Sequence, residues 1–193
     1  MSKSEKIEKE LRKIKEEVLN CKKCLLYRTR TYPVIGQGNH QAKIVFIGEA
    51  PGRNEDKTGR PFCGKAGKIL DELLESVGIK RKDVYICNIL KCRPPGNRDP
   101  NGEEINTCVP YLERQIQIIK PKIICTLGNY STAYILRKYN LEDKIQGISK
   151  IHGEIFSKDT VKIIPLYHPA VATYNSNMIG VLKEDMKILG KFK

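Results

Sequence analysis

Hydrophobic positions recur at helical spacing at the start of the chain and form short continuous runs farther along. The apolar positions of the first twenty residues lie three or four residues apart and predict an amphipathic helix over about residues 3–20. They are Ile7, Leu11, Ile14 and Val18. Continuous β-branched runs are typical of strands covered on both faces. Four such runs span residues 43–48, 83–90, 122–128 and 161–167.

Helix-like segments alternate with these strands. They lie at about residues 64–77, 102–119, 129–139 and 177–189. This alternation predicts an α/β fold, a three-layer α/β/α sandwich on a mainly parallel sheet. A chain of 193 residues with 40% hydrophobic content is long enough for one well-filled core and short for two. We therefore expect a single domain over residues 1–193.

The loops after the four predicted strands are rich in glycine, proline and polar residues. Ligands of parallel α/β sheets gather at the carboxyl ends of the strands, so we expect the active site at this edge. Gly48, Glu49 and Ala50 come directly after the first strand, where small residues let the backbone approach a ligand closely. The segment lacks the glycine patterns of nucleotide phosphate loops. A plain turn with solvated acids is the alternative interpretation.

Three more side chains at this edge are candidates for contact with a nucleobase. Phe62 stands in a glycine-rich loop, where its ring either stacks on a base or belongs to the core. The amide of Asn88 either matches the edge of a pyrimidine or is satisfied structurally. His168, at the end of the fourth strand, is alone more often structural, but beside Glu49 it becomes a candidate donor to a developing anion.

The cysteines fall into two groups. The first twenty residues have no apolar core of signal-peptide length, and no run approaches the about 20 apolar residues that span a bilayer. We therefore expect a cytoplasmic protein, whose cysteines are metal ligands or buried thiols rather than disulfides. Cys87 and Cys125 lie within strand-like runs and are predicted to be inert, and Cys63 is isolated in a loop.

The remaining four cysteines have the placement of metal ligands. Cys21 and Cys24 form a C-x2-C pair, whereas Cys92 and Cys108 are separated by fifteen residues. Structural zinc sites usually have two short pairs, and an iron–sulfur cluster tolerates irregular spacing better. The spacing favours an iron–sulfur cluster, with zinc and no metal as alternatives.

The formal charge of +13 favours a polyanionic partner such as nucleic acid. The alternative is that a composition rich in Lys, Ile and Glu reflects growth at high temperature.

Taken together, the motifs resemble those of family 4 uracil-DNA glycosylases, the iron–sulfur branch of the uracil-DNA glycosylase superfamily. The similarity runs from about residue 10 to the end and rests on GEAPGRNED, GRPFCGKAG, NILKCRPPGNRDP, YHPA and the four cysteines at 21, 24, 92 and 108. It implies a four-stranded parallel sheet between helices and a 4Fe–4S cluster on these cysteines. It also implies an enzyme that flips uracil out of single- or double-stranded DNA and hydrolyses its N-glycosidic bond, leaving an abasic site.

The resemblance implies a role for individual residues. Glu49 would be the catalytic carboxylate, with Glu55 and Asp56 as alternatives for positioning the water. His168 would donate to uracil O2. The implied substrate-binding residues are Gly48, Ala50, Phe62, Asn88 and His168, with Phe62 stacking on uracil and Asn88 pairing with its polar edge.

DNA contacts are expected from Arg93 and Arg98 through phosphates. After YHPA this family commonly continues with Leu-Arg, whereas Val171 to Asn175 follow here. Tyr174 is therefore the candidate to wedge or stack in the duplex. Cys63 stands where a small aliphatic residue is usual, and we expect it to affect packing next to Phe62.

Two rival functions stay open. One is a relative with altered base preference that acts on hypoxanthine or xanthine, against which Asn88 argues. The other is a nonenzymatic nucleic-acid-binding module with a structural metal, in which Glu49, Asn88 and His168 together would be unexpected. We expect a monomer with no membrane partner.

Overall fold

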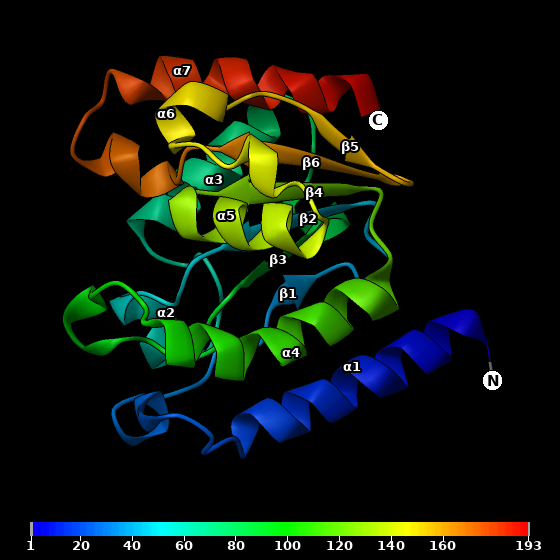
Figure 1. Ribbon diagram of the computed structural model, residues 1–193, viewed down its shortest axis with the longest axis vertical. Coiled ribbons are helices and arrows are strands. Elements are labelled where there is room, and N and C mark those ends of the chain that lie inside the picture. Colours follow the sequence, from blue (N-terminus) through cyan, green and yellow to red (C-terminus); the bar gives the residue numbers. More distant parts are fainter. Residues whose placement is uncertain (1, 193) are drawn as a thin grey trace.

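A six-stranded sheet forms the centre of the computed structural model, which describes residues 2–192. The strand order is β1-β3-β2-β4-β6-β5 (Figure 1). The four middle strands are parallel and confirm the four predicted ones; they are β2 (Ile44–Gly48), β3 (Tyr85–Asn88), β4 (Ile123–Leu127) and β6 (Val161–Leu166).

Two short antiparallel strands at the edges were not predicted. β1 (Gln37–Gly38) pairs with β3, and β5 (Phe156–Lys158) pairs with β6. Both are too short to show a hydrophobic period in the sequence. In the middle of the sheet, β3 and β4 lie on opposite sides of β2, so the direction of the crossovers reverses there. At such a point the loops diverge and open a crevice for a ligand.

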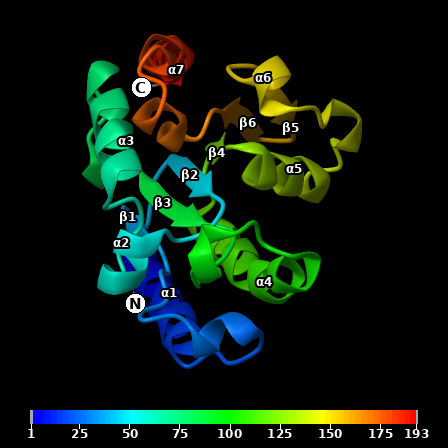
Figure 2. The same ribbon diagram turned by 90° about the vertical axis from the view of Figure 1, so that its left-hand side faces the viewer.

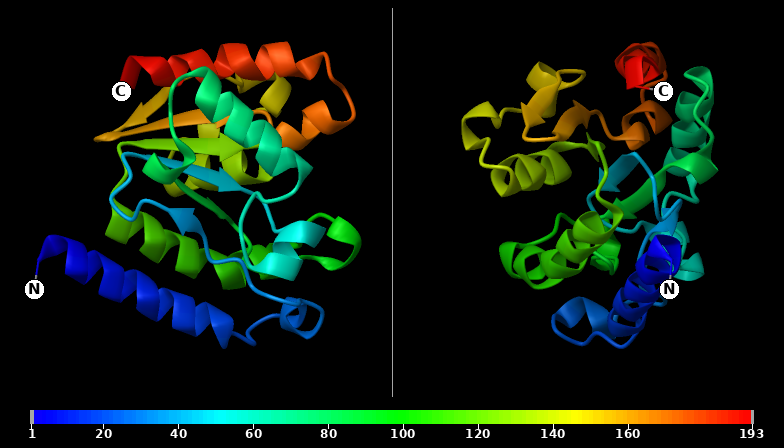
Figure 3. Two further views of the ribbon diagram at one scale, coloured as in Figure 1. Left: turned by 180° about the vertical axis from the view of Figure 1, so that it is seen from behind. Right: turned by 90° about the vertical axis from the view of Figure 1, so that its right-hand side faces the viewer.

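Helices cover both faces of the sheet (Figures 2 and 3). One face carries α1 (Lys3–Leu19), α4 (Gly102–Ile119), α5 (Asn129–Lys138) and α6 (Ile148–Ile151), and the other carries α3 (Lys65–Ser76) and α7 (Met178–Met186). The short helix α2 (Arg53–Thr58) follows β2. Short 3-10 helices span Leu25–Arg28, Arg81–Asp83, Pro95–Asn97, Glu142–Lys144, Pro169–Thr173 and Lys187–Phe192.

The continuous hydrophobic runs are explained by this double cover. In β2, Val45 and Ile47 pack into the cluster with α1, α4 and α5, whereas Ile44 and Phe46 pack into the cluster with α3 and α7. A strand that is covered on both faces has no solvent-exposed face, so its sequence does not alternate between hydrophobic and polar residues. The three-layer prediction is therefore confirmed.

The first helix begins with a capping box, in which Ser2 Oγ accepts the Glu5 N–H and the Glu5 carboxylate accepts the Ser2 N–H. Its buried stripe packs on α4, and Arg114 of α4 binds the Glu17 carboxylate. The helix ends just before Cys21, as predicted, and so brings that cysteine beside α4. Among the described residues, no helix has the length and apolar content needed to cross a membrane.

Candidate active site and cysteine site

A cavity of about 480 Å³ opens at the carboxyl edge of the sheet. This volume lies within the about 300 to 1,000 Å³ typical of small-molecule sites. The cavity brings together most of the predicted site residues, from the loops after β2, β3 and β6. They are Glu49, Ala50, Phe62, Asn88, Arg98, His168 and Tyr174.

Asn88 forms the floor of this cavity. It is the last residue of β3, 1% exposed, and the sheet pairs it directly with Gly48. Its Oδ1 is buried without a hydrogen-bond partner among the described residues. A Cβ at position 48 would lie 2.4 Å from that oxygen, so only glycine leaves room in front of it. An orphaned buried acceptor costs about 1 to 3 kcal/mol, and the geometry therefore suits a ligand that brings an N–H.

Phe62 forms a wall of the cavity and has a left-handed backbone, with φ at +47°. For a bulky residue this conformation is strained and persists only when its surroundings impose it. Glu55 imposes it from one side, because its Oε1 accepts the N–H groups of Cys63 at 2.9 Å and Gly64 at 3.0 Å. Gly67 permits it on the other side, since a Cβ there would lie 1.9 Å from the Phe62 carbonyl oxygen.

His168 stacks beside Phe62, with ring centroids 5.5 Å apart. The Ala170 N–H donates to His168 Nδ1 at 3.1 Å, so the neutral ring carries its proton on Nε2. Burial lowers the pKa of His168 to about 4. At neutral pH the side chain is therefore an uncharged imidazole with one N–H to donate.

Glu49 is the acid that the structure leaves available. It lines the cavity, and burial, assisted by the nearby Asp99 carboxylate, raises its pKa. Glu55 also lines the cavity but is engaged with the loop after Phe62. Asp56 is 5% exposed, and its Oδ1 accepts the Thr31 N–H at 2.9 Å away from the cavity lining. Of the three predicted candidates, Glu49 is therefore the one that lines the cavity without holding a neighbouring loop among the described residues, and its catalytic role stays a prediction.

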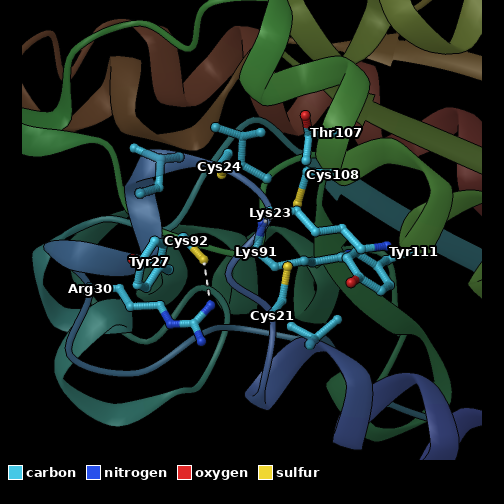
Figure 4. Close-up of a pocket in the computed structure, with 13 residues that line it drawn as sticks. Cys21, Lys23, Cys24, Tyr27, Arg30, Lys91, Cys92, Thr107, Cys108 and Tyr111 are labelled. Carbon is cyan, nitrogen blue, oxygen red and sulfur yellow. Dashed lines mark hydrogen bonds between the residues drawn. The ribbon is translucent and has the colours of Figure 1, made fainter.

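The four ligand-type cysteines surround a second, much smaller space (Figure 4). Cys21 and Cys24 follow α1, Cys92 lies in the turn after β3, and Cys108 belongs to α4. Apolar and aromatic side chains enclose the same space, namely Val18, Leu26, Leu90 and Tyr111. Segments far apart in the sequence thus deliver four thiols to one place.

The surroundings of these sulfurs suit thiolate ligands. Arg30 Nη1 donates to Cys92 Sγ at 3.1 Å, and the Lys91 backbone N–H donates to Cys108 Sγ at 3.2 Å. Burial raises the pKa of Cys24 and Cys92, and raises that of Cys108 to about 12. Bound iron or zinc deprotonates such thiols, and hydrogen bonds to sulfur are among the features that tune iron–sulfur clusters. Within residues 2–192, no three metal-binding side chains lie close enough together to hold a single ion.

Comparison with known proteins identifies the family. A family model described as the uracil DNA glycosylase superfamily matches residues 35–188. The chain belongs to this superfamily. A type-4 uracil-DNA glycosylase of Sulfurisphaera tokodaii is 50% identical over 182 residues, covering 92% of this chain and 82% of the relative.

Two further type-4 uracil-DNA glycosylases support the same assignment. The one from Saccharolobus solfataricus is 48% identical and covers 90% of this chain and 82% of the relative. The one from Archaeoglobus fulgidus is 44% identical and covers 92% and 90%. The resemblance drawn from the sequence motifs is therefore confirmed.

The predicted DNA contacts have different environments in this glycosylase. Arg98 lines the cavity, but its guanidinium binds both oxygens of Glu104, which is 4% exposed, at 2.9 and 2.6 Å. Arg93 lies outside the cavity lining and donates from Nε to Asn97 Oδ1 at 2.6 Å. Tyr174 stands at the cavity and is 78% exposed. Their contact with DNA stays a prediction.

Sequence reasoning missed three features of the site. Glu55 clamps the Phe62 loop, Asp99 raises the pKa of Glu49, and Lys91 is buried between the cavity floor and the cysteines. Only Lys91 had a signal in the sequence, since it directly follows the apolar run at residues 83–90. Cys87 and Cys125 are buried strand residues, as predicted.

Proposed function

We propose that this protein removes uracil from DNA by hydrolysing the bond between the base and its sugar. The observation that carries the proposal is that Asn88, whose Oδ1 is buried without a hydrogen-bond partner among the described residues, lines a cavity together with Phe62 and His168. Uracil has an N3–H donor next to the O4 acceptor, and one amide side chain pairs with both. Cytosine has an acceptor at N3 and a donor at position 4. The amide oxygen would then face an acceptor and the amide N–H would face a donor, so neither hydrogen bond could form.

Glu49 and His168 then divide the chemistry between them. As the bond breaks, positive charge develops on the sugar and negative charge on uracil. The Nε2–H of His168 donates to uracil O2 and stabilises the anion, while the Glu49 carboxylate stabilises the cation and positions the attacking water. The neutral state of His168 suits this donor role, since its proton is held on the correct nitrogen before uracil arrives.

We propose that Cys21, Cys24, Cys92 and Cys108 hold a 4Fe–4S cluster. Four thiols around one enclosed space, with N–H donors to two of the sulfurs, fit such a ligand set. When bound, the cluster supplies a structural crosslink rather than a step in hydrolysis. The four cysteines would then fix the loop after β3, so that Arg93 and Arg98 of this loop can contact DNA phosphates.

The DNA substrate presents its uracil flipped out of the stack. Flipping costs a few kcal/mol and is easiest from single strands and mismatches, so we expect U·G and single-stranded uracil to react faster than U·A. The exposure of the Tyr174 ring at the cavity supports the proposal that this side chain stacks in the duplex.

The test is incubation of purified protein with end-labelled DNA that contains one uracil. We expect free uracil and an alkali-labile abasic site, and no product from the same DNA with cytosine. A panel with hypoxanthine and xanthine separates the altered-specificity rival. Tight binding with no base released from any substrate would support the nonenzymatic rival.

A further inference from the structure

Lys91 is a fully buried lysine in the turn between the base pocket and the cysteine site. It is 1% exposed, and its side chain appears among the cysteines in Figure 4. Burying an ammonium is costly unless its hydrogen bonds and charge are met. Nothing in the proposed hydrolysis uses it, so its position needs another explanation.

The side chain of Lys91 reaches back to the floor of the base pocket. Its ammonium donates to the backbone carbonyl of Asn88 at 2.9 Å and to Gln115 Oε1 at 2.7 Å. Gln115, 1% exposed, in turn donates from Nε2 to the Ile35 carbonyl and to the Tyr85 hydroxyl, both at 3.0 Å. This network fixes the peptide through which Asn88 leaves β3.

The main chain of Lys91 is anchored to the cysteine site. Its N–H donates to Cys108 Sγ at 3.2 Å, its carbonyl accepts the Val34 N–H at 2.7 Å, and the next residue is Cys92. The same residue therefore contacts a cysteine sulfur through its backbone and the Asn88 carbonyl through its ammonium. Both acceptors of the Lys91 Nζ are uncharged groups, so hydrogen bonds rather than an ion pair hold this side chain.

We propose that Lys91 is a positioning residue that links the cysteine site to uracil recognition, by holding the Asn88 carbonyl and thereby the direction of the Asn88 amide. The inference rests on the proposed function. Asn88 Oδ1 has no hydrogen-bond partner among the described residues, so the orientation of the amide depends on the position of the Asn88 backbone. A shift of about 1 Å in such a group is enough to cost on the order of 10²-fold in rate.

The test uses Lys91→Met, which keeps an unbranched chain and removes the donor. We expect single-turnover uracil release at saturating enzyme to fall on the order of 10²-fold. Affinity for free uracil, measured by calorimetry, should fall about tenfold, the effect of about one hydrogen bond. Affinity for uracil-free DNA should not change. Preparations are matched for iron content before comparison.

A double-mutant cycle separates positioning from general destabilisation. If Lys91 acts through Asn88, Lys91→Met should have almost no further effect in an Asn88→Ala background.

The matched control is Thr126→Val, which removes a buried hydroxyl that lies 2.8 Å from Thr132 Oγ1. It should lower the melting temperature without changing affinity for free uracil. If Lys91→Met does not fold, Gln115→Met tests the same network and should show a smaller loss with the same dependence on Asn88.

Equal losses in both Asn88 backgrounds, or unchanged affinity for free uracil, would overturn the role of Lys91 while wild-type protein still releases uracil. If the wild-type protein releases no uracil, the proposed function fails first, and the inference fails with it.

Discussion

The base pocket and the cysteine site lie close together but are built in different ways. The pocket takes its residues from the ends of parallel strands, and the sheet register itself sets Gly48 opposite Asn88. The cysteine site takes its residues from the end of α1, a turn and the middle of α4, and no strand pairing fixes their distances. The pocket is therefore preorganised by the backbone, whereas the positions of the thiols depend on side-chain packing and on the cluster proposed to bind there.

The ionisable groups of the base pocket and of the cysteine site also differ. The pocket holds a histidine that is uncharged at neutral pH, the Glu49 carboxyl group, whose pKa is raised by burial, and an amide oxygen without a hydrogen-bond partner among the described residues. Burial raises the pKa of the cysteines, so their thiolates need a cation. Changes in the pocket should therefore alter rate with little loss of stability, and changes at the cysteines should alter stability and metal content first.

The largest effect on rate is expected at Glu49. Glu49→Gln removes the charge that stabilises the cationic sugar and should slow single-turnover uracil release by about 10²- to 10³-fold. The melting temperature and DNA affinity should stay near wild type, because phosphate contacts dominate binding.

Glu55→Gln is the matched control for this change. It keeps the oxygen that accepts the Cys63 and Gly64 N–H groups, so it should retain most activity. A wild-type rate in Glu49→Gln with a large loss in Glu55→Gln would transfer the catalytic role to Glu55.

Asn88→Asp should have the next largest effect. The carboxylate lacks the N–H that pairs with uracil O4, so uracil release should fall on the order of 10²-fold, and the ratio of cytosine to uracil release should rise. Single-turnover assays on matched uracil and cytosine DNA measure both. Unchanged rate and selectivity would remove Asn88 from base recognition.

At the cysteine site, Cys108→Ser should lose most of its iron and melt several degrees lower, while the rate at low temperature falls less than in Glu49→Gln. Iron and acid-labile sulfide are measured on anaerobically purified protein. Cys63→Ser is the control and should keep its iron, since Cys63 lies beside Thr58 and not in this site. Stoichiometric zinc without iron in the wild-type protein would contradict the cluster.

The pH dependence gives a further distinction. The pKa of His168 is lowered from 6.5 to about 4 by burial, so its contribution to stability is complete above pH 6.5 and is lost as the pH falls toward 4. Urea unfolding measures this effect, and the free energy of unfolding should differ less between pH 7 and pH 5 in His168→Gln than in wild type.

The pH dependence of the rate tests Glu49. Its pKa is raised, so the rate should fall at acid pH as Glu49 is protonated, and no transition should appear near pH 6.5. A rate that follows a group with pKa 6.5 would place a charged histidine in the mechanism.

The smallest effect is expected from the arginines. Arg93→Ala should weaken DNA binding and reduce the slope of log affinity against log salt by about 1, with saturated cleavage nearly intact. Arg98→Ala should also lower stability, because it leaves the buried Glu104 carboxylate without its positively charged partner. Identical effects of the two changes on salt slope and melting temperature would show that the Arg98–Glu104 pair is not structural.

The sequence by itself determined the five main helices, the four parallel strands, the edge that holds the site and the four cysteines. These features follow from local properties: hydrophobic period, glycine-rich loops after apolar runs and the spacing of thiols. The motif resemblance supplied the candidate roles of Glu49 and His168, and the structure places both residues at the cavity.

Only the tertiary structure decided the rest. It showed that any side chain at position 48 would crowd Asn88 Oδ1, that Glu55 accepts N–H groups of the loop after Phe62, and that Lys91 contacts both sites. Glu49, Glu55 and Asp56 are three acidic residues of one short segment, and the sequence does not show which hydrogen-bond donors surround each carboxylate after folding. Those donors come from segments distant in sequence, such as Thr31 for Asp56, so no local pattern records them. Register, burial and long-range pairing are properties of the packed chain, and they give the three acids different surroundings.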